Sequence, residues 1–429
     1  MSRTRVLTGI TTSGTPHLGN YVGAIRPAVA ASLDAGVESF YFLADYHALI
    51  KVTDPARVQR STLEIAATWL ACGLDPSKVW FYRQSDVPET TELTWLLTCV
   101  AGKGLLNRAH AYKASVDRNR EAGEDDDAGV TAGLFMYPVL MAADILLFNA
   151  RRVPVGRDQV QHIEMARDFA QRFNHLYGEH FVLPEAAIEA HVATLPGLDG
   201  RKMSKSYDNT IPLFAPREQL RKLIAGIVTD SSAPGEPKDA DGSHVFQLYQ
   251  AFATGAETQA MRERFAAGIG WGEAKQALFE RIDAEVAPLR ERYEALIADP
   301  AAIETVLRDG AARLRAAHAT PMLRALREAV GLRDLSRAPA SKDDPARPRA
   351  TAPAFKQYRE ADGRFYFKLV HGDRVLLQSA GFDSPREAGL RIAALRRDGR
   401  AGLAVEDAAA VDAALAELAR FEAGKAART

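Results

Sequence analysis

The chain has 429 residues, 47% of them apolar and 25% charged, with a net charge of −1, so it is long enough to form two or three domains. Its two cysteines, Cys72 and Cys99, lie far apart without the spacing of metal ligands, which excludes a disulfide framework and a structural zinc site. The longest apolar stretch, residues 133–148, is too short to span a membrane, and no secretory signal is visible, so we expect a cytoplasmic protein with no membrane contact.

Over the first two hundred residues, short β-rich runs alternate with helical patterns. The predicted strands are residues 5–10, 39–45, 79–85 and 151–155, and the predicted helices lie near residues 19–34, 54–72, 89–101, 131–149 and 158–175. This alternation predicts an α/β domain over residues 1–211, with a parallel sheet covered by helices on both faces. Ligands bind such sheets at the carboxyl ends of the strands, so we expect the chemistry in the loops after Ile10, Asp45, Ser85 and Val155.

Beyond about Pro212 the strand signals stop. Helical patterns fill residues 212–335, which predicts an all-α domain whose last helix packs back on the rest. Residues 336–354, "SRAPASKDDPARPRATAPA", are rich in Pro, Ala and charge without an apolar period, and we interpret them as a linker.

Residues 355–429 form a third predicted unit of the ββα type. Apolar and polar residues alternate on both sides of His371-Gly372-Asp373, which indicates a hairpin, and a helix capped by Ser384 and a last helix over 406–422 follow. From residue 336 to the end there are 17 Lys and Arg against 13 Asp and Glu. This excess suggests a basic appendix, although a solvated face explains it about equally well.

The first residues that could carry chemistry stand where the first strand ends, in "GITTSGTPHLGNYVGAIRP" (9–27). Gly9 and Gly14 let the backbone approach a ligand closely, and Gly19 with Asn20 opens a helix whose N-terminus can receive phosphate. His17 and Asn20, three residues apart, would place two neutral donors on one side of the turn. On its own this stretch is as well explained by an ordinary glycine-rich turn.

A second polar stretch, "RKMSKSYDN" (201–209), is too polar for a core strand and lacks the apolar spacing of an amphipathic helix. Together, "HLGN" (17–20) and "KMSKS" (202–206) resemble the two signatures of the class I aminoacyl-tRNA synthetases. The resemblance implies a Rossmann-like catalytic domain in which the first motif holds ATP and the second closes over its phosphates, with Mg²⁺ bridging them. The ATP-binding residues that it implies are Thr11, His17, Gly19, Asn20, Asp158, Met203, Ser204 and Lys205.

The two lysines of the second motif have a physical role in such a reaction. When an amino-acid carboxylate attacks the α-phosphate of ATP, negative charge builds on the departing pyrophosphate. Lys202 and Lys205 on a movable loop can meet that charge more strongly in the transition state than in the ground state.

The apolar segment "MYPVLMAADILLF" (136–148) carries one acid, Asp144, which needs a donor if it is buried. With residues 153–174 it resembles the bacterial tryptophanyl-tRNA synthetases, and the resemblance extends over about residues 3–332. It implies that Asp144 accepts the indole N–H, so that phenylalanine, which has no such donor, is rejected. The other tryptophan-binding residues that it implies are Tyr137 and Gln159 for the ammonium group and Leu7, Gly9, His47, Met141, Val153 and Val155 for the rest of the pocket.

The region 107–130 matches the mobile, lysine-bearing loop of that family only in part. Lys113 fits as a third catalytic lysine, whereas Ser115 stands where a second loop lysine is common. Which lysine of this loop reaches ATP is therefore open.

The resemblance implies L-tryptophan, ATP and tRNA(Trp) as substrates and a homodimer across which the tRNA binds, with the helical domain on the anticodon side. Residues 363–399 resemble a small bacterial ββα module of unknown function, for which a salt-dependent tRNA contact and a dimer contact are rival hypotheses. For the whole chain the rivals are a tyrosine-specific relative, a catalytically silent RNA-binding paralogue and a nucleotidyltransferase of small-molecule metabolism.

Overall fold

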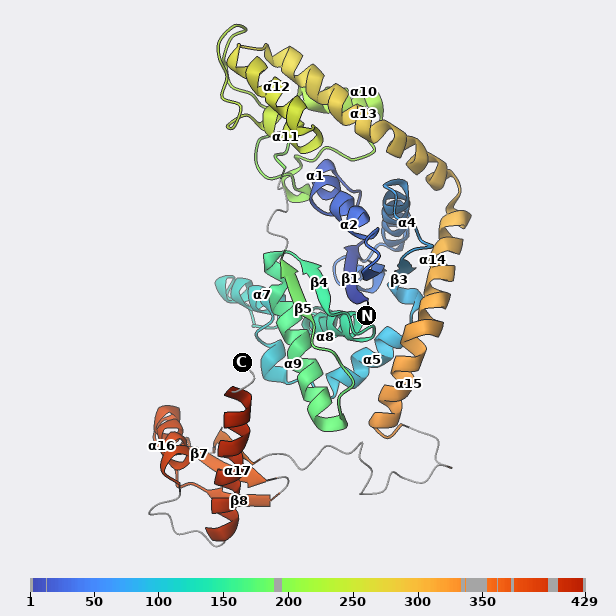
Figure 1. Ribbon diagram of the computed structural model, residues 1–429. Helices are drawn as coiled ribbons and strands as arrows, with labels where there is room; N and C mark the ends of the chain where they lie inside the picture. Colours follow the sequence, from blue (N-terminus) through green and yellow to red (C-terminus); the bar gives the residue numbers. More distant parts are fainter. Residues whose placement is uncertain are drawn as a thin grey trace. The chain divides into compact units, whose positions relative to one another are not determined.

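The computed structural model describes residues 3–12, 14–188, 195–332, 336, 353–360, 362–371, 374–399 and 408–426, without the side chains of Asp158 and residues 420–426. The chain divides into two compact units (Figure 1). The first comprises Met1–His175 and Glu179–Asp334, and the second comprises Leu176–Gly178 and Leu335–Thr429. In the described residues, no helix combines the length and the apolar character needed to cross a membrane.

The first unit contains a five-stranded parallel sheet in the order β3-β2-β1-β4-β5. Four strands, β1 (Thr4–Thr11), β2 (Val37–Ala44), β3 (Trp80–Arg83) and β4 (Arg152–Val155), lie at the predicted places. The edge strand β5 (Glu185–Ile188) was not predicted, because "EAAI" is short and its two alanines have weak β-propensity. The predicted parallel α/β fold is confirmed.

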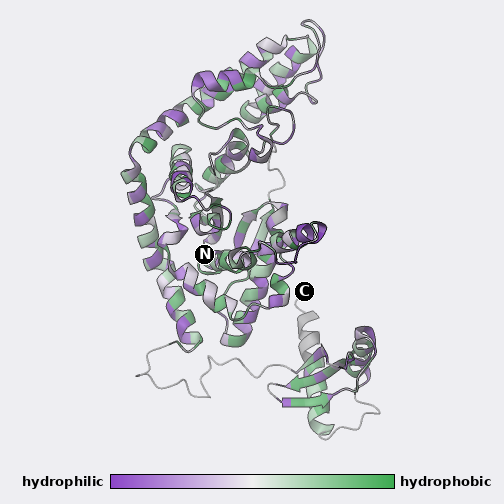
Figure 2. Ribbon diagram, turned by 180° about the vertical axis from the view of Figure 1, so that it is seen from behind, coloured by the Kyte–Doolittle hydropathy of each residue, from purple (hydrophilic) through white to green (hydrophobic). Residues whose placement is uncertain are grey.

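Helices connect the strands and cover the sheet. Their bounds are α1 (Leu18–Asn20), α2 (Arg26–Ala31), α3 (Asp45–Ala48), α4 (Pro55–Ala71), α5 (Glu89–Thr98), α6 (Lys103–Leu106), α7 (His110–Glu121), α8 (Ala132–Leu146) and α9 (Val160–Tyr177), with a π-helical turn over Tyr21–Ile25. The prediction of a loop over 107–130 is wrong for α7, which is a strongly hydrophilic helix (purple in Figure 2). Its Ala, Lys, Arg and Glu favour a helix even without an apolar face.

The all-α part consists of α10 (Arg217–Ala225), α11 (His244–Phe252), α12 (Gly255–Ala266), α13 (Trp271–Ala298), α14 (Pro300–Leu314) and α15 (Thr320–Ala329). Figure 1 shows α13, α14 and α15 following one another along one side of the unit. Helix α14 packs against β3 so closely that a Cβ on Gly310 would lie 1.9 Å from the carbonyl oxygen of Phe81, so only glycine is tolerated there. One core cluster runs from the sheet into α10–α14, and the domain boundary at 211/212 stays a prediction.

The second unit is a three-stranded antiparallel sheet, β6-β7-β8, with two helices. Its elements are β6 (Ala354–Arg359), β7 (Phe365–His371), β8 (Arg374–Gln378), α16 (Pro385–Asp398) and α17 (Ala408–Ala426). The predicted ββα core is present with Ser384 as the N-cap of α16, while β6 was not predicted because its alternation begins in the proline-rich segment. Gly372 and Asp373 of the predicted hairpin turn and most of the predicted linker lie outside the described residues.

Candidate active site

A cavity of about 550 Å³ opens at the carboxyl ends of β1, β2 and β4. All nine residues predicted to bind tryptophan line it: Leu7, Gly9, His47, Tyr137, Met141, Asp144, Val153, Val155 and Gln159. Thr11 lines it as well, together with residues that the sequence did not single out, among them Phe42, Lys51 and Leu134. The structure therefore brings residues from three strands and from the helices α3, α7 and α8 to the edge where a parallel sheet offers a ligand site.

Asp144 of α8 is 2% exposed and already has two donors from the protein. The side-chain amide of Gln84 donates to its two carboxylate oxygens at 2.8 and 2.9 Å, and His47 Nε2 lies 3.0 Å from Oδ2. Burial raises the pKa of Asp144, and the hydrogen bonds from His47 and Gln84 oppose that rise. A carboxylate has about four lone-pair sites, so these contacts leave capacity for one further donor.

Gln84 is fully buried and was not predicted. Its amide oxygen accepts from the backbone N–H of Tyr46 at 3.1 Å, so it joins α3 to Asp144. The sequence signal that could have found it is its position, because it directly follows β3, at the sheet edge where ligands bind.

A second residue that sequence reasoning missed, His162, connects the two side chains predicted to hold an ammonium group. It is 2% exposed, with Nδ1 3.0 Å from the amide oxygen of Gln159 and Nε2 2.5 Å from the hydroxyl of Tyr137. Because an amide oxygen only accepts, Nδ1 carries the proton, and a neutral imidazole then accepts at Nε2 from the tyrosine O–H. The hydroxyl proton of Tyr137 thus points at His162, which leaves the phenolic oxygen to act as an acceptor toward the cavity.

In the first motif, His17 and Asn20 form a capping box, in which the backbone N–H of each residue donates to the side chain of the other. The N–H of Asn20 donates to His17 Nδ1 at 3.3 Å, and the N–H of His17 donates to the Asn20 side-chain oxygen at 3.1 Å. Burial, followed by the charge of Lys205, lowers the pKa of His17 to about 4, so the ring is neutral near pH 7. With Nδ1 accepting, Nε2 carries the hydrogen, and His17 and the side-chain NH₂ of Asn20 are both donors, as expected.

The second motif lies against the first. The N–H of Leu18 donates to Ile211 O and that of Leu213 to Pro16 O, both at 3.0 Å, and a Cβ on Gly19 would be 3.7 Å from that of Met203. At Gly14, whose φ is +83°, an added Cβ would lie 3.2 Å from Lys205 Nζ. Partial burial and the charge of Arg57 lower the pKa of Lys205, against the opposing charge of Glu64. The ammonium group of the second motif is therefore held at the glycine turn of the first.

Asn209 fixes the shape of the second motif and was also missed. It is 2% exposed. Its amide donates to Asp199 Oδ1 at 2.6 Å and to Lys202 O at 3.1 Å, and its side-chain oxygen accepts from the N–H of Ser204 at 2.8 Å. A side chain on Gly197 would collide with it, since an added Cβ would lie 2.4 Å from its amide.

The side chains of three predicted residues, Lys202, Lys113 and Asp158, are not shown in contact with the other site residues. Lys202 is exposed on the loop, and Lys113 is exposed on α7, two residues after Ala111, which lines the cavity. The side chain of Asp158 lies outside the described residues. The structure thus brings Lys205, His17 and Gly19 together but shows no contact of Lys202 or Lys113 with them.

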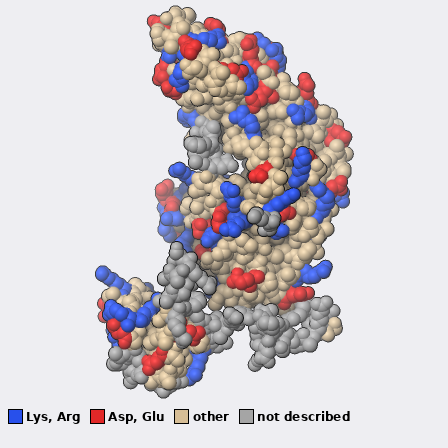
Figure 3. Space-filling view, viewed as in Figure 1, with Lys and Arg blue, Asp and Glu red and all other residues tan. Residues whose placement is uncertain are grey.

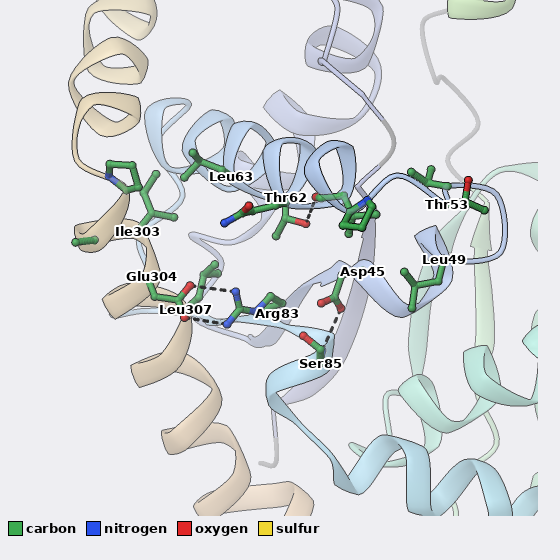
Figure 4. Close-up of a pocket in the computed structure, with 16 residues that line it drawn as sticks. Asp45, Leu49, Thr53, Thr62, Leu63, Arg83, Ser85, Ile303, Glu304 and Leu307 are labelled. Carbon is green, nitrogen blue, oxygen red and sulfur yellow. Dashed lines mark hydrogen bonds and ion pairs between the residues drawn. The ribbon is translucent and has the colours of Figure 1, made fainter.

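A second cavity, of about 800 Å³, lies between α3, α4 and α14 (Figure 4). Arg83 at its floor donates to Glu304 at 3.0 Å and to Asp86 at 2.8 and 3.0 Å. Asp45 accepts from the backbone N–H groups of Ser85 and Tyr46 at 3.1 Å. The charged side chains of this cavity are thus paired within the chain, and most of its other lining residues are apolar.

Comparison with known proteins gives one consistent answer. A family model described as tRNA synthetases class I (W and Y) matches residues 1–287. A tryptophan–tRNA ligase of Xanthomonas axonopodis pv. citri is 74% identical over 400 residues, covering 93% of each chain, and one of Pseudomonas aeruginosa is 61% identical over 436 residues, covering 96% of this chain and 97% of that one. The solved tryptophanyl-tRNA synthetase of Campylobacter jejuni, complexed with ADP and tryptophan, is 42% identical with a TM-score of 0.71, covering 76% of this chain and 100% of its own.

Proposed function

The chain belongs to the class I tRNA synthetases for tryptophan and tyrosine, among the bacterial tryptophan–tRNA ligases, and we propose that the 550 Å³ cavity is where it activates tryptophan. The chain is an ATP-dependent ligase. It activates L-tryptophan with ATP to tryptophanyl-adenylate and pyrophosphate and then transfers the tryptophanyl group to tRNA(Trp).

The observation that carries the site assignment is the remaining acceptor capacity of Asp144. In our proposal the indole N–H donates to this carboxylate, while Gln84 and His47 hold it in place. Phenylalanine would occupy the same apolar walls without supplying a donor, and a buried acceptor left partly unpaired costs binding energy. Leu7, Gly9, Met141, Val153 and Val155 line the rest of the cavity, which suits a flat ring.

The ammonium group of the substrate lies, in this proposal, between Tyr137 and Gln159. The phenolic oxygen of Tyr137 is an acceptor toward the cavity because its proton is directed to His162. The carboxylate at the other end of the substrate is then free to point toward the two motifs, where ATP is expected.

For ATP we propose contacts with the donors of the first motif and with the loop of the second. His17 Nε2–H and the Asn20 amide would meet phosphate oxygens, with Gly19, Thr11 and Asp158 nearby, while Met203, Ser204 and Lys205 would approach from the loop. His17 and Asn20 offer donors rather than anionic metal ligands, so we propose that Mg²⁺ is held by the phosphate oxygens of ATP, where it would neutralise their charge.

The chemistry that the chain itself supplies is positioning and charge stabilisation. The tryptophan carboxylate attacks the α-phosphate and pyrophosphate leaves. Lys205, held at Gly14, is placed to meet the charge of that leaving group, and we propose the same role for Lys202 and Lys113 when substrate is bound.

We also propose a cytoplasmic homodimer with tRNA(Trp) bound across both subunits. Trp95 of α5 is 66% exposed, and so large an apolar side chain at the surface is typical of a region that a partner covers.

Exchange of pyrophosphate into ATP with each of the twenty amino acids tests the assignment. We expect exchange with tryptophan alone, and its loss in Asp144→Ala and Lys205→Ala. Exchange with tyrosine would favour the tyrosine-specific relative, and exchange with no amino acid would favour a silent paralogue.

A further inference from the structure

The sheet of the second unit has one face that is packed and one that is open. Phe367, Leu369 and Leu377 form a core with Ala388 and Leu395 of α16 and with Val411 and Ala414 of α17. On the same side, the Gln357 amide donates to Pro385 O at the start of α16. Both helices therefore cover the same face, and strand residues of the opposite parity point away from them.

That outer face carries two tyrosines and two lysines on adjacent strands. Tyr358 pairs with Tyr366 and Lys356 with Lys368 in the register of β6 and β7. The two tyrosine rings stack with centroids 5.8 Å apart and planes at 23°, and Lys368 Nζ lies 5.4 Å from the Tyr358 centroid. Lys356 is exposed, and Tyr358, Tyr366 and Lys368 are half-buried, so the rings can be reached from solvent.

Two carboxylates lie near the turn between β6 and β7, at one end of this face. Tyr366 donates its hydroxyl to Asp362 at 2.5 Å, and Glu360 stands in the same turn. The turn also contains Arg359 and Arg364, which balance those two acids in number. At one end of the ring pair, the Tyr366 hydroxyl thus binds the turn, and at the other end lie the ammonium groups of Lys356 and Lys368.

We propose that the outer face of the β6-β7-β8 sheet is a contact surface for an unpaired segment of the substrate tRNA. The proposal rests on the proposed function, which makes tRNA(Trp) a substrate of this chain. Unstacked bases bind on exposed aromatic rings, and neighbouring lysines neutralise the adjacent phosphates. Charge complementarity favours this occupant over an apolar partner, because Lys356 and Lys368 flank the rings on this face. Figure 3 shows further Lys and Arg side chains, in blue, at the surface of the second unit.

The comparison with relatives indicates how large the effect should be. The Campylobacter chain matches over its whole length while leaving about a quarter of this chain unmatched, a share close in size to the second unit. Charging therefore proceeds in that fold without such a unit. The surface should accordingly lower the KM for tRNA and leave tryptophan activation unchanged.

The experiment uses the full chain and a tRNA(Trp) transcript, and compares Tyr358→Ala/Tyr366→Ala, Tyr358→Phe/Tyr366→Phe and Lys356→Gln/Lys368→Gln. As a matched control, Val375→Thr changes an exposed residue of β8 without touching the rings. We expect the alanine pair to raise the KM for tRNA about tenfold, because stacking on an aromatic ring contributes about 1–3 kcal/mol per base. The phenylalanine pair should retain wild-type KM.

Salt dependence separates the lysines from the rings. The lysine pair should lower the slope of log affinity against log salt by about 1.4, at about 0.7 per phosphate of a single strand. Pyrophosphate exchange, which needs no tRNA, should be the same in all variants. An unchanged KM in the alanine and lysine pairs would overturn the proposal, and an altered sedimentation coefficient with unchanged KM would assign the face to a second copy of the chain. Failure of the wild-type chain to catalyse tryptophan-dependent exchange would instead overturn the proposed function.

Discussion

The two cavities of the first unit differ in how their polar groups are used. In the larger one, Arg83 is engaged with Glu304 and Asp86, and Asp45 with two backbone N–H groups, so its charged side chains already have partners within the chain. In the smaller one, Asp144 and Tyr137 keep acceptor capacity toward the cavity after their internal hydrogen bonds are made. We propose the smaller cavity as the substrate site because a buried carboxylate with remaining acceptor capacity lines it, and not because of its volume.

The two cavities are also close neighbours. Val52 lines both, and the segment 45–52 places His47 on one side and Asp45 and Leu49 on the other. The same short piece of chain after β2 thus lines the proposed substrate cavity on one side and the larger cavity on the other. Substitutions on its two sides should have opposite consequences for catalysis and for stability.

The largest effect is expected at Asp144. Asp144→Ala removes the acceptor for the indole and leaves the Gln84 amide and His47 Nε2 without their partner. The loss of a charge-assisted hydrogen bond, at about 1.5–3 kcal/mol, and of the partner of buried donors predicts a fall in kcat/KM for tryptophan of ~1,000-fold. Exchange at varied tryptophan concentration measures it, with thermal unfolding as the control for folding. A fall of threefold or less would contradict the role of Asp144.

Lys205→Ala should act on a different kinetic constant. Its ammonium group sits at Gly14, outside the tryptophan cavity, so tryptophan binding measured by calorimetry should stay within about twofold. The rate constant of adenylate formation should fall about 100-fold, as expected when one donor to a developing anion is removed. The matched variant Lys202→Ala, exposed on the same loop, shows whether both lysines share the role. A raised Kd for tryptophan with an unchanged rate constant of adenylate formation would contradict this role and would indicate that Lys205 contacts tryptophan.

Much of this organisation could be predicted from the sequence because it depends on local sequence patterns. Four of the five strands have β-rich runs, the nine residues implied for tryptophan line one cavity, and the two motifs pack against each other. Gln84, His162 and Asn209 were missed because each acts by bridging segments that only the fold brings together. The larger cavity had no sequence signature either, since its walls come from α3, α4 and α14.

Substitution of His162 tests whether this buried residue, which connects Tyr137 and Gln159, affects substrate binding without contacting the reacting atoms. His162→Ala removes the acceptor of the Tyr137 hydroxyl and the donor to Gln159, so the ammonium subsite loses its orientation. We expect the KM for tryptophan to rise about tenfold with a smaller change in kcat. Binding of indole-3-propionate, which has no ammonium group, should change less than twofold. Equal losses for both ligands would mean that His162 only supports packing.

A smaller effect is expected in the pH dependence of stability, because the buried His17 of the first motif titrates differently from an exposed histidine. Its pKa is about 4 in the folded chain against 6.5 for a free histidine, so the unfolded chain binds a proton first as the pH falls below 6.5. Because the His17 ring stays neutral in the folded chain, the free energy of unfolding falls progressively as the pH drops from 6.5 to 4, and it is unaffected by this group above pH 6.5. His17→Asn, which keeps an N-cap oxygen, should lose less stability than wild type between pH 7 and 5 in thermal unfolding. Identical pH dependence of both chains would contradict a buried neutral His17.

The smallest effect on catalysis is expected in the larger cavity. Glu304→Gln weakens the bond between α14 and β3, but Glu304 has a 45% exposed side chain and Arg83 keeps Asp86, so the cost in stability should be about 1 kcal/mol or less. Exchange and charging rates should stay within twofold, because the charged groups Arg83, Glu304 and Asp45 are paired within the chain and the proposed substrate residues line the other cavity. Leu307→Ala, which enlarges the same cavity from its apolar wall, should lower the melting temperature more while leaving the rates as they are. A tenfold loss of exchange in Glu304→Gln, with normal unfolding, would show that α14 transmits its position through β3 to Gln84 and Asp144, and the contrast between the two cavities would then be one of distance from the substrate rather than of function.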